Sequence, residues 1–155
     1  MNQELHVASM QCMCEVRPPK PSDYEKMADL AGQLGYERTG AQVQARIDGM
    51  RDLNEYAVYV AELPGGQIAG WFGVYTFRAV ALDRFAETSG LVVDQQIRSR
   101  GIGKALLAIA EQWARTRACP TISVRSNVTR DRAHWFYPRN GYEHIKTQKL
   151  FQKQL

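Results

Sequence analysis

The chain has 155 residues, of which 45% are hydrophobic, so it is long enough for one well-filled core and too short for two ordinary domains. Its formal net charge is +4, from 20 basic and 16 acidic residues, and no long basic run or nucleic-acid-binding signature accompanies it, so we expect no nucleic-acid partner. The sequence has no signal-peptide core, no apolar stretch that could span a bilayer, and three cysteines whose spacing fits neither a disulfide framework nor a zinc site.

These features predict a cytoplasmic protein with no membrane partner and no resident metal. Residues 1 to 10 lack clear periodicity and are predicted to form a partly disordered extension, which is followed by a single domain over residues 11 to 155. Thr39-x-x-Gln42 is typical of a capping box, and Pro64-Gly65-Gly66 of a hairpin turn. The elements expected in the N-terminal half are a strand over 12–17, a helix that Ser22 or Asp23 caps and that runs to Gln33, a helix from Thr39 to Leu53, and strands over 56–63 and 67–80.

The C-terminal half alternates strands and helices. Gly90 lies inside one strand, where a glycine indicates a bulge or a close backbone approach, a glycine that merely relieves packing being the alternative. The elements expected are a polar connection over 82–85, a strand over 86–93, a helix over 101–117, a strand over 121–127, a helix over 130–139 capped by Thr129, and an extended segment from Gly141 to Leu150. The order βααβββαβαβ predicts an α/β (α+β) fold, a mixed, twisted sheet flanked by helices on both faces.

Residues 98 to 104 read Arg-Ser-Arg-Gly-Ile-Gly-Lys and predict an anion cradle between a strand and a helix. A helix N-terminus presents backbone N–H groups without intrahelical partners, and the two glycines let a phosphate approach them closely. Glycines also punctuate ordinary strand-to-helix turns, but such turns need no cations, and this segment has three. The segment does not match the Walker A loop, because Ala105 follows Lys104 where that motif has Ser or Thr. It does not match the dinucleotide motif either, because Leu106 stands at the last glycine position.

The remaining pattern, R-x-x-G-x-G after a strand and before a helix, resembles motif A of the GNAT superfamily, the acyl-CoA-dependent N-acetyltransferases. A second stretch, Ala133 to Tyr137 followed by Gly141-Tyr142, resembles the family's helix that carries A-x-x-F/L-Y and ends in G-F/Y. The two motifs cover roughly the C-terminal half and lie in the family's order, with a strand between them. The resemblance implies a GNAT-like sheet and an enzyme that uses acetyl-CoA as its co-substrate.

The resemblance also implies where this co-substrate binds. In the family, the pantetheine arm lies between the strand before the cradle and the strand after the helix, where the two strands splay apart. The family's usual asparagine, seven residues before the tyrosine, is Arg130 here, which could reach a phosphate; Asn127 is either its substitute or an ordinary turn residue. The implied cofactor-binding residues are Leu91, Val92, Val93, Arg98, Ser99, Arg100, Gly101, Ile102, Gly103, Lys104, Asn127 and Arg130.

Two residues are candidates for proton transfer. Tyr137 matches the family's tyrosine that points at the cofactor sulfur, and a phenol with a pKa near 10 can protonate a thiolate leaving group; an aromatic core anchor is the alternative. Glu87 is the candidate general base, and simple alternation puts it on one strand face with Leu91 and Val93. A solvated Glu87, with a water chain assisted by Ser89 as the base, is the competing interpretation.

The acceptor site is expected to combine aromatic walls with carboxylates, in the loop over 35–38, the strand over 67–80 and the connection over 81–86. The candidates are Trp71 and Tyr75, or Phe72 on the opposite face, with Glu37, Asp83 or Glu87. We therefore expect an acetyl-CoA-dependent N-acetyltransferase that acts on a primary amine of a small molecule by direct attack in a ternary complex. A noncatalytic acyl-CoA sensor or interaction module, and a transferase for protein N-termini or lysines, stay open as alternatives, as do the acyl-chain length and the oligomeric state, a homodimer included.

Overall fold

The computed structural model describes residues 14 to 155, and the chain divides into two compact units, one that ends at Arg125 and one over Ser126–Leu155. The first unit contains the sheet and three α-helices, and the second contains one α-helix. The disorder predicted for residues 1 to 10 lies outside the described residues. The single domain over residues 11 to 155 stays a prediction.

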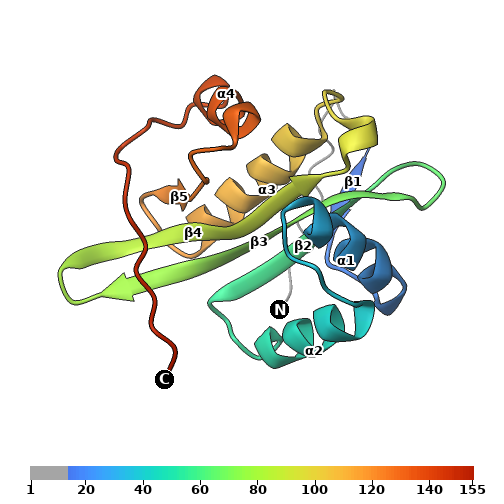
Figure 1. The fold of residues 1–155 in the computed structure, drawn as a ribbon, viewed down its shortest axis with the longest axis horizontal. Coiled ribbons are helices and arrows are strands. Elements are labelled where there is room, and N and C mark those ends of the chain that lie inside the picture. Colours follow the sequence, from blue (N-terminus) through green and yellow to red (C-terminus); the bar gives the residue numbers. More distant parts are fainter. Residues whose placement is uncertain (1–13) are drawn as a thin grey trace. The chain divides into compact units, whose positions relative to one another are not determined.

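The first unit is built on one five-stranded sheet, in which neighbouring strands follow the chain order β1-β2-β3-β4-β5 (Figure 1). The first four strands pair antiparallel, and β4 pairs parallel with β5, so the sheet is mixed as predicted. The parallel pair needs a crossover connection, and α3 (Ile102–Thr116) supplies it. The strands are β1 (Glu15–Arg17), β2 (Tyr56–Glu62), β3 (Ile68–Ala79), β4 (Leu82–Val93) and β5 (Ile122–Val124).

Helices cover both faces of this sheet, as predicted. On one face, here called the α3 face, Leu106 of α3 joins the fully buried Phe72 of β3 in the larger core cluster. On the other, the α1 face, Leu30 of α1 packs with Val60 of β2 and with side chains of α2. The helices of this face are α1 (Tyr24–Gln33) and α2 (Gly40–Met50), and the short 3₁₀ turns are η1 (Pro21–Asp23) and η2 (Gln95–Ile97).

A side-chain cap marks the start of α2 but not that of α1. The capping box predicted for α2 is confirmed, because Thr39 Oγ1 accepts the backbone N–H of Gln42 at 3.3 Å and Gln42 Oε1 accepts that of Thr39 at 3.1 Å. The side-chain cap predicted for α1 is wrong. The carboxylate of Asp23 accepts from Arg17 at 2.7 Å instead, and α1 begins at the next residue without a side-chain cap.

The β3–β4 hairpin is longer than predicted. β4 already begins at Leu82, opposite Ala79, so the connection predicted over 82–85 belongs to the strand. Two charged residues in this stretch interrupt the apolar alternation and hide the strand in the sequence. Phe77 and Phe85 stabilise the extended pairing, since their ring centroids lie 5.0 Å apart across the two strands.

β4 contains the bulge that Gly90 predicts. Gly90 lies opposite Gly73, and Thr88 lies opposite the next residue of β3, so Ser89 has no partner on β3. A Cβ at position 90 would lie 3.1 Å from the Trp71 ring, which makes glycine the residue that fits best there. The bulge therefore depends on a close approach between β4 and an aromatic ring of β3.

The bulge changes which residues of β4 share a face, and it corrects the alternation expected for Glu87. A strand's side chains alternate with a period of two, so one extra residue reverses the faces beyond it. Glu87 pairs with Tyr75 and faces the α1 side together with Ser89, whereas Leu91 and Val93 pack in the core cluster of the α3 face. Glu87 and the two aliphatic residues thus lie on opposite faces.

The second unit contains α4 (Asp131–Arg139), which lies within one residue of the predicted helix. Gly141 adopts φ +85°, and its N–H donates to the Pro138 carbonyl at 3.1 Å, which closes the helix end. The cap predicted at Thr129 is wrong, because its hydroxyl donates to Asn127 Oδ1 at 3.0 Å within the turn before the helix.

The last two predicted strands are shorter than expected or absent. β5 spans only three residues of the predicted 121–127, and the segment predicted from Gly141 to Leu150 forms no strand in the second unit. A strand needs a neighbouring backbone to complete its hydrogen bonds, and the second unit contains no other strand. The observed order of helices and strands is therefore βααβββαβα.

Two glycine-to-alanine substitutions should change stability in opposite directions. A Cβ at Gly70 of β3 would lie 2.5 Å from the backbone oxygen of Val92, which cannot move away easily, so Gly70→Ala should lower the free energy of unfolding by about 1 to 3 kcal/mol. Gly49 is exposed in α2 with no atom near its Cβ position, so Gly49→Ala should raise it by about 0.5 to 1 kcal/mol. Urea unfolding measures both, and an unchanged midpoint for Gly70→Ala would contradict the described β3–β4 approach.

Candidate active site

An ion pair between Asp94 and Lys26, here called the Asp94 clamp, lies at the end of β4, just before the predicted cradle. The Asp94 carboxylate accepts the backbone N–H of Gln96 at 3.1 Å and forms an ion pair with Lys26 of α1 at 2.7 Å. Asp94 is only 4% exposed, and the hydrogen bond from Lys26 is the main cause that lowers the pKa of its carboxyl group below the usual value. The clamp ties the end of β4 to α1 and so fixes where the cradle loop begins.

The cradle loop turns the chain into α3 through two residues with left-handed backbone. Ser99 has φ +65° and Gly101 has φ +78°, and Gly101 is the residue immediately before the helix. Left-handed backbone costs a non-glycine residue about 1 to 2 kcal/mol, so glycine suits position 101, and the conformation of Ser99 marks the loop as a candidate functional site. Gly101 is exposed, whereas the side chain of Ile102 is anchored in the core.

The cradle presents positive charge to solvent. The N–H groups of the first three residues of α3 have no carbonyl four positions earlier within the helix, and the helix dipole adds partial positive charge there. Arg100 and Lys104 are exposed, while Arg98 folds back so that its Nε donates to the Val93 carbonyl at 3.2 Å. This set of donors fits a phosphate or pyrophosphate group.

β4 and β5 stop pairing just before the bulge. The parallel ladder ends where Thr88 lies opposite Val124, although β4 continues to Val93. Within the first unit, no strand pairs with this side of β4 beyond Thr88. The separation has the form of the splay that the sequence resemblance implies.

Backbone groups of Leu91 and Val93 face this unpaired edge. The N–H of Asp94 donates to the Ala69 carbonyl of β3 at 2.8 Å, so the backbone of residue 94 points toward β3. Backbone groups of successive residues alternate sides along a strand, so Val92 also faces β3, whereas its two neighbours face away from it. Of the three residues predicted to hold the pantetheine arm, Leu91 and Val93 therefore face the edge, where the Val93 carbonyl already accepts from Arg98 Nε.

Glu87 is a buried, hydrogen-bonded carboxylate, which corrects the interpretation as a solvated side chain. The residue is 5% exposed, and its Oε1 accepts from the Tyr75 hydroxyl at 2.5 Å and from Arg125 Nε at 2.9 Å. Tyr75 lies opposite it on β3, and Arg125 directly follows β5. Burial, with the hydrogen bond to Glu87 and its negative charge, raises the pKa of Tyr75 to about 12, so the phenol stays protonated at neutral pH.

A second phenol lies beside the first on the α1 face. Tyr56 of β2 is the cross-strand neighbour of Tyr75, and their rings stack with centroids 6.1 Å apart and planes inclined by 7°. The Tyr56 hydroxyl and Ser89 Oγ form a hydrogen bond of 2.5 Å. Gly73 lies between the two strands at this point, and a Cβ there would overlap Ser89 Oγ. The stacked rings, the serine and the glutamate thus form one polar patch.

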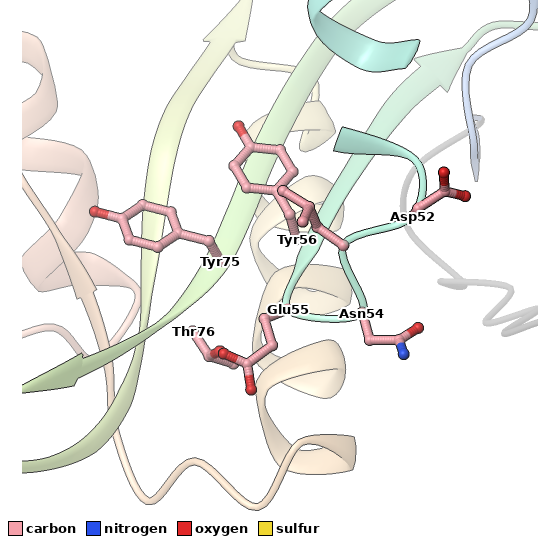
Figure 2. Close-up of a pocket in the computed structure, with 7 residues that line it drawn as sticks. Asp52, Asn54, Glu55, Tyr56, Tyr75 and Thr76 are labelled. Carbon is pink, nitrogen blue, oxygen red and sulfur yellow. The ribbon is translucent and has the colours of Figure 1, made fainter. Parts of the chain in front are cut away.

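A pocket of about 550 Å³ opens beside the stacked rings, around the start of β2 (Figure 2). Glu55 accepts from Arg78 Nη2 at 2.6 Å and from Thr76 Oγ1 at 2.8 Å, and these bonds hold the pKa of Glu55 at about 2. Asp52 is exposed at the pocket and forms no ion pair within residues 14–155. The pocket is lined by Asp52, Leu53, Asn54, Glu55, Tyr56, Tyr75 and Thr76.

The structure separates the residues predicted for the acceptor site. Trp71 donates its Nε1–H to a backbone carbonyl of α1 at 3.1 Å, and Phe72 is fully buried on the α3 face, so both support the fold. Glu37 is exposed between α1 and α2, and Asp83 is exposed in the β3–β4 hairpin. Among the three predicted aromatic residues, Tyr75 is the one that lines the pocket.

Tyr56 and Arg125 belong to this site but were not predicted from the sequence. The hairpin turn at residues 64 to 66 carries a usable signal for Tyr56, because counting back from it along both strands brings Tyr56 close to Tyr75. No comparable signal exists for Arg125, since its contact with Glu87 depends on the register of a parallel strand pair that a helix connects.

Three predicted site residues lie in the second unit. Tyr137 packs against Phe136 and Tyr142, with ring centroids 5.2 and 5.7 Å apart, and burial raises the pKa of its hydroxyl to about 12. Asn127 Oδ1 accepts the backbone N–H two residues later at 3.1 Å, which is the geometry of an ordinary turn. Arg130 is the residue immediately before α4. Their roles in binding and catalysis stay predictions.

Residues 54 to 144 match the family model of the acetyltransferase (GNAT) domain, and this match covers more than half of the chain. The chain belongs to the GNAT superfamily. The matched region runs from just before β2 through α4, so it includes the cradle and both sequence motifs. The resemblance read from those motifs is confirmed, and this GNAT protein is an acetyltransferase.

Named relatives of this GNAT acetyltransferase act on different amines. It is similar to the aminoalkylphosphonate N-acetyltransferase of Salmonella typhimurium, with 29% identity over 134 residues that span 84% of this chain and 86% of the relative. It is also similar to the aminoglycoside N(6')-acetyltransferase type 1 of Klebsiella aerogenes, with 25% identity over 147 residues that span 90% of this chain and 96% of the relative.

Among solved structures, the chain resembles the aminoglycoside N-acetyltransferase AAC(6')-Iy in complex with CoA. The TM-score is 0.80 at 16% sequence identity, and the match covers 96% of this chain and 100% of that chain. This likeness confirms the predicted GNAT-like fold.

Over residues 14–155, no group of three or more His, Cys, Asp or Glu residues is placed to hold a metal ion, and no helix is long and apolar enough to cross a membrane.

The Asp94 clamp should contribute a pH-dependent part of the stability. A carboxyl group whose pKa is lowered on folding contributes stability above its unfolded pKa, 3.8 here, and loses it as the pH falls through the lower folded value. Asp94→Asn should therefore lower the free energy of unfolding by about 1 to 3 kcal/mol at pH 7. Urea unfolding of both proteins from pH 7 down to about pH 3 should show this difference shrinking, and a constant difference would contradict an ionised clamp.

Proposed function

We propose that the protein transfers an acetyl group from acetyl-CoA to the primary amine of a small molecule, by direct attack of the amine in a ternary complex. The observation that carries this proposal is the open, positively charged N-terminus of α3 beside the unpaired edge of β4. A helix N-terminus suits a diphosphate, and a strand edge with unpaired backbone groups suits an extended amide chain. Acetyl-CoA contains both of these groups, and it supplies a thioester-bound acetyl group.

The residues at this junction fit such a co-substrate. The backbone N–H groups over 98–104 would hold the pyrophosphate, and the exposed side chains of Arg100 and Lys104 would compensate its charge. The backbone groups of Leu91 and the N–H of Val93 at the unpaired edge would hold the amides of the pantetheine arm, since the Val93 carbonyl accepts from Arg98. The side chain of Arg98, already bonded to β4, orders the loop from behind and leaves its backbone N–H groups as the donors.

The chain offers one residue for each proton that the reaction moves. Transfer forms a C–N bond and breaks the C–S bond, so the amine must lose a proton and the thiolate must gain one. Glu87, a carboxylate next to the point where β4 and β5 separate, is the proposed acceptor of the amine proton. Tyr137 is the proposed donor to the thiolate, because the A-x-x-F-Y motif assigns it and its hydroxyl stays protonated at neutral pH with a pKa of about 12.

The pocket beside the stacked tyrosines supports a small molecule as the acceptor. Its volume of about 550 Å³ lies in the range of ligand pockets, and the phenol rings and the exposed carboxylate of Asp52 suit a cationic amine. Two relatives, an aminoalkylphosphonate and an aminoglycoside N-acetyltransferase, are named for small amines, which supports an acceptor of this kind. They differ in the charge of the acceptor, so both types belong in the test.

A panel of amines tests the proposed function directly. Purified protein with acetyl-CoA should release CoA thiol in the presence of at least one of 2-aminoethylphosphonate, kanamycin, spermidine and a lysine-containing peptide. Lines that intersect in a double-reciprocal plot should accompany turnover, as a ternary complex requires, whereas parallel lines would indicate a covalent intermediate. Calorimetric binding of acetyl-CoA without turnover on any amine would favour a sensor, and turnover on the peptide alone would favour a protein acetyltransferase.

The proposed acid should affect turnover and not binding. Tyr137→Phe removes the hydroxyl and keeps the ring, so kcat should fall by about 10- to 100-fold, while the Kd for acetyl-CoA stays within about twofold. Stopped assays give kcat, and calorimetry gives the Kd. An unchanged kcat would reject Tyr137 as the proton donor.

A further inference from the structure

We propose that Tyr75 is a positioning residue which, together with Arg125, occupies one oxygen of the Glu87 carboxylate and thereby leaves the other oxygen for the amine of the acceptor. This inference rests on the proposed function and deepens it, since it says how the proposed base is held. Neither sequence motif covers Tyr75 or Arg125, and the assignment comes from the arrangement of three side chains on β3, β4 and the residue after β5.

The two oxygens of Glu87 have different surroundings. Oε1 accepts both hydrogen bonds, from the Tyr75 hydroxyl at 2.5 Å and from Arg125 Nε at 2.9 Å. Within the described chain, Oε2 has no hydrogen-bond partner. The fully buried side-chain atoms that lack a partner do not include Oε2, so part of this oxygen's surface is accessible. Glu87 as a whole is 5% exposed, so the small exposed part of this carboxylate includes the oxygen that the protein does not use.

The fold holds both donors in place. Tyr75 lies opposite Glu87 in the antiparallel ladder, and its ring is stacked on Tyr56, which restricts the direction of its hydroxyl. Arg125 follows the strand whose Ser123 lies opposite Glu87 in the parallel ladder. The donors thus approach from neighbouring strands on the two sides of β4. A rotation of the carboxylate would break both bonds, so Oε2 keeps one orientation.

Tyr75 can serve only as a donor in this arrangement. Its pKa of about 12 keeps the hydroxyl protonated throughout the neutral range, and a carboxylate oxygen only accepts. The phenol therefore does not compete for the proton of the amine, and Oε2 is the group that receives it. The ring of Tyr75 also lines the pocket, so the positioning residue lies next to the space proposed for the acceptor.

This arrangement predicts which acceptors the site prefers. A charged amine offers an N–H donor and a positive charge to a nearly buried carboxylate oxygen, while an alcohol of the same shape offers only a neutral donor. A fixed carboxylate with a single available oxygen therefore favours amines over alcohols.

Tyr75→Phe tests the proposal because it removes the hydroxyl and keeps the ring that stacks on Tyr56. With whichever of 2-aminoethylphosphonate, kanamycin or spermidine turns over fastest, kcat/KM for the amine should fall by about 10- to 100-fold. The Kd for acetyl-CoA should stay within about twofold, and the protein should stay folded with a lower melting temperature, because Glu87 loses one of its two hydrogen bonds. Tyr59→Phe is the matched control, since Tyr59 stacks on Phe72 on the α3 face, outside the site, and should change none of these values.

A double-mutant cycle with Glu87→Gln distinguishes a positioning role from an independent one. If Tyr75 acts through Glu87, Tyr75→Phe should weaken binding of the same amine in the presence of CoA by several-fold in the unaltered protein and have no further effect in Glu87→Gln. Calorimetry measures this cycle without requiring turnover. An equal loss in both backgrounds, or full kcat/KM in Tyr75→Phe, would overturn the proposal. If the unaltered protein acetylates no amine in the panel, the proposed function itself fails.

Discussion

The bulge at Ser89 and Gly90 is the constraint on which the site depends, because it allows one strand to serve two purposes. Before the bulge, β4 presents Glu87 to the α1 face; beyond it, the side chains of Leu91 and Val93 fill the core of the α3 face while their backbone groups face the unpaired edge. The same bulge lies where the parallel pairing with β5 ends. Gly90 permits this geometry, since a side chain there would meet the Trp71 ring. A regular strand would place the carboxylate and the two aliphatic residues on the same face.

Charge is distributed along β4 in a way that separates the proposed binding groups from the proposed base. At the end of the strand, the Asp94–Lys26 pair holds the backbone, and the exposed cations of the cradle follow it. In the middle of the strand, Glu87 is nearly buried and bound by a phenol and a guanidinium. Burying a carboxylate is costly unless it is paired, so this pairing explains how Glu87 can lie nearly buried on the sheet. The positive and the negative part of the site thus belong to one strand and its continuation.

The sequence predicts several features that depend on neighbouring residues, although the caps at Asp23 and Thr129 were wrong, and it is insufficient for features that depend on register. The capping box at Thr39, the bulge at Gly90 and the cradle are local patterns, and each could be predicted. The face of Glu87 could not, because counting alternate residues fails once a bulge adds one. The contact of Arg125 with Glu87 joins distant segments through a parallel strand pair, so no spacing rule reveals it. The beginning of β4 could not be predicted, because the outer part of the hairpin contains charged residues and is stabilised by aromatic pairing across the two strands.

The outer part of the β3–β4 hairpin extends beyond its neighbours in the sheet. β2 pairs with β3 only as far as Tyr75, and β5 pairs with β4 only from Ala86, so the residues between them form a ribbon of two strands. Such ribbons are marginally stable alone and open locally more readily than a central sheet. Arg78 and Arg84 both bind Glu55, which ties this ribbon to the wall of the pocket. Within the sheet, amide-exchange protection should therefore be lower in the ribbon than in the central strands, and its fraying would loosen the pocket without disturbing the core.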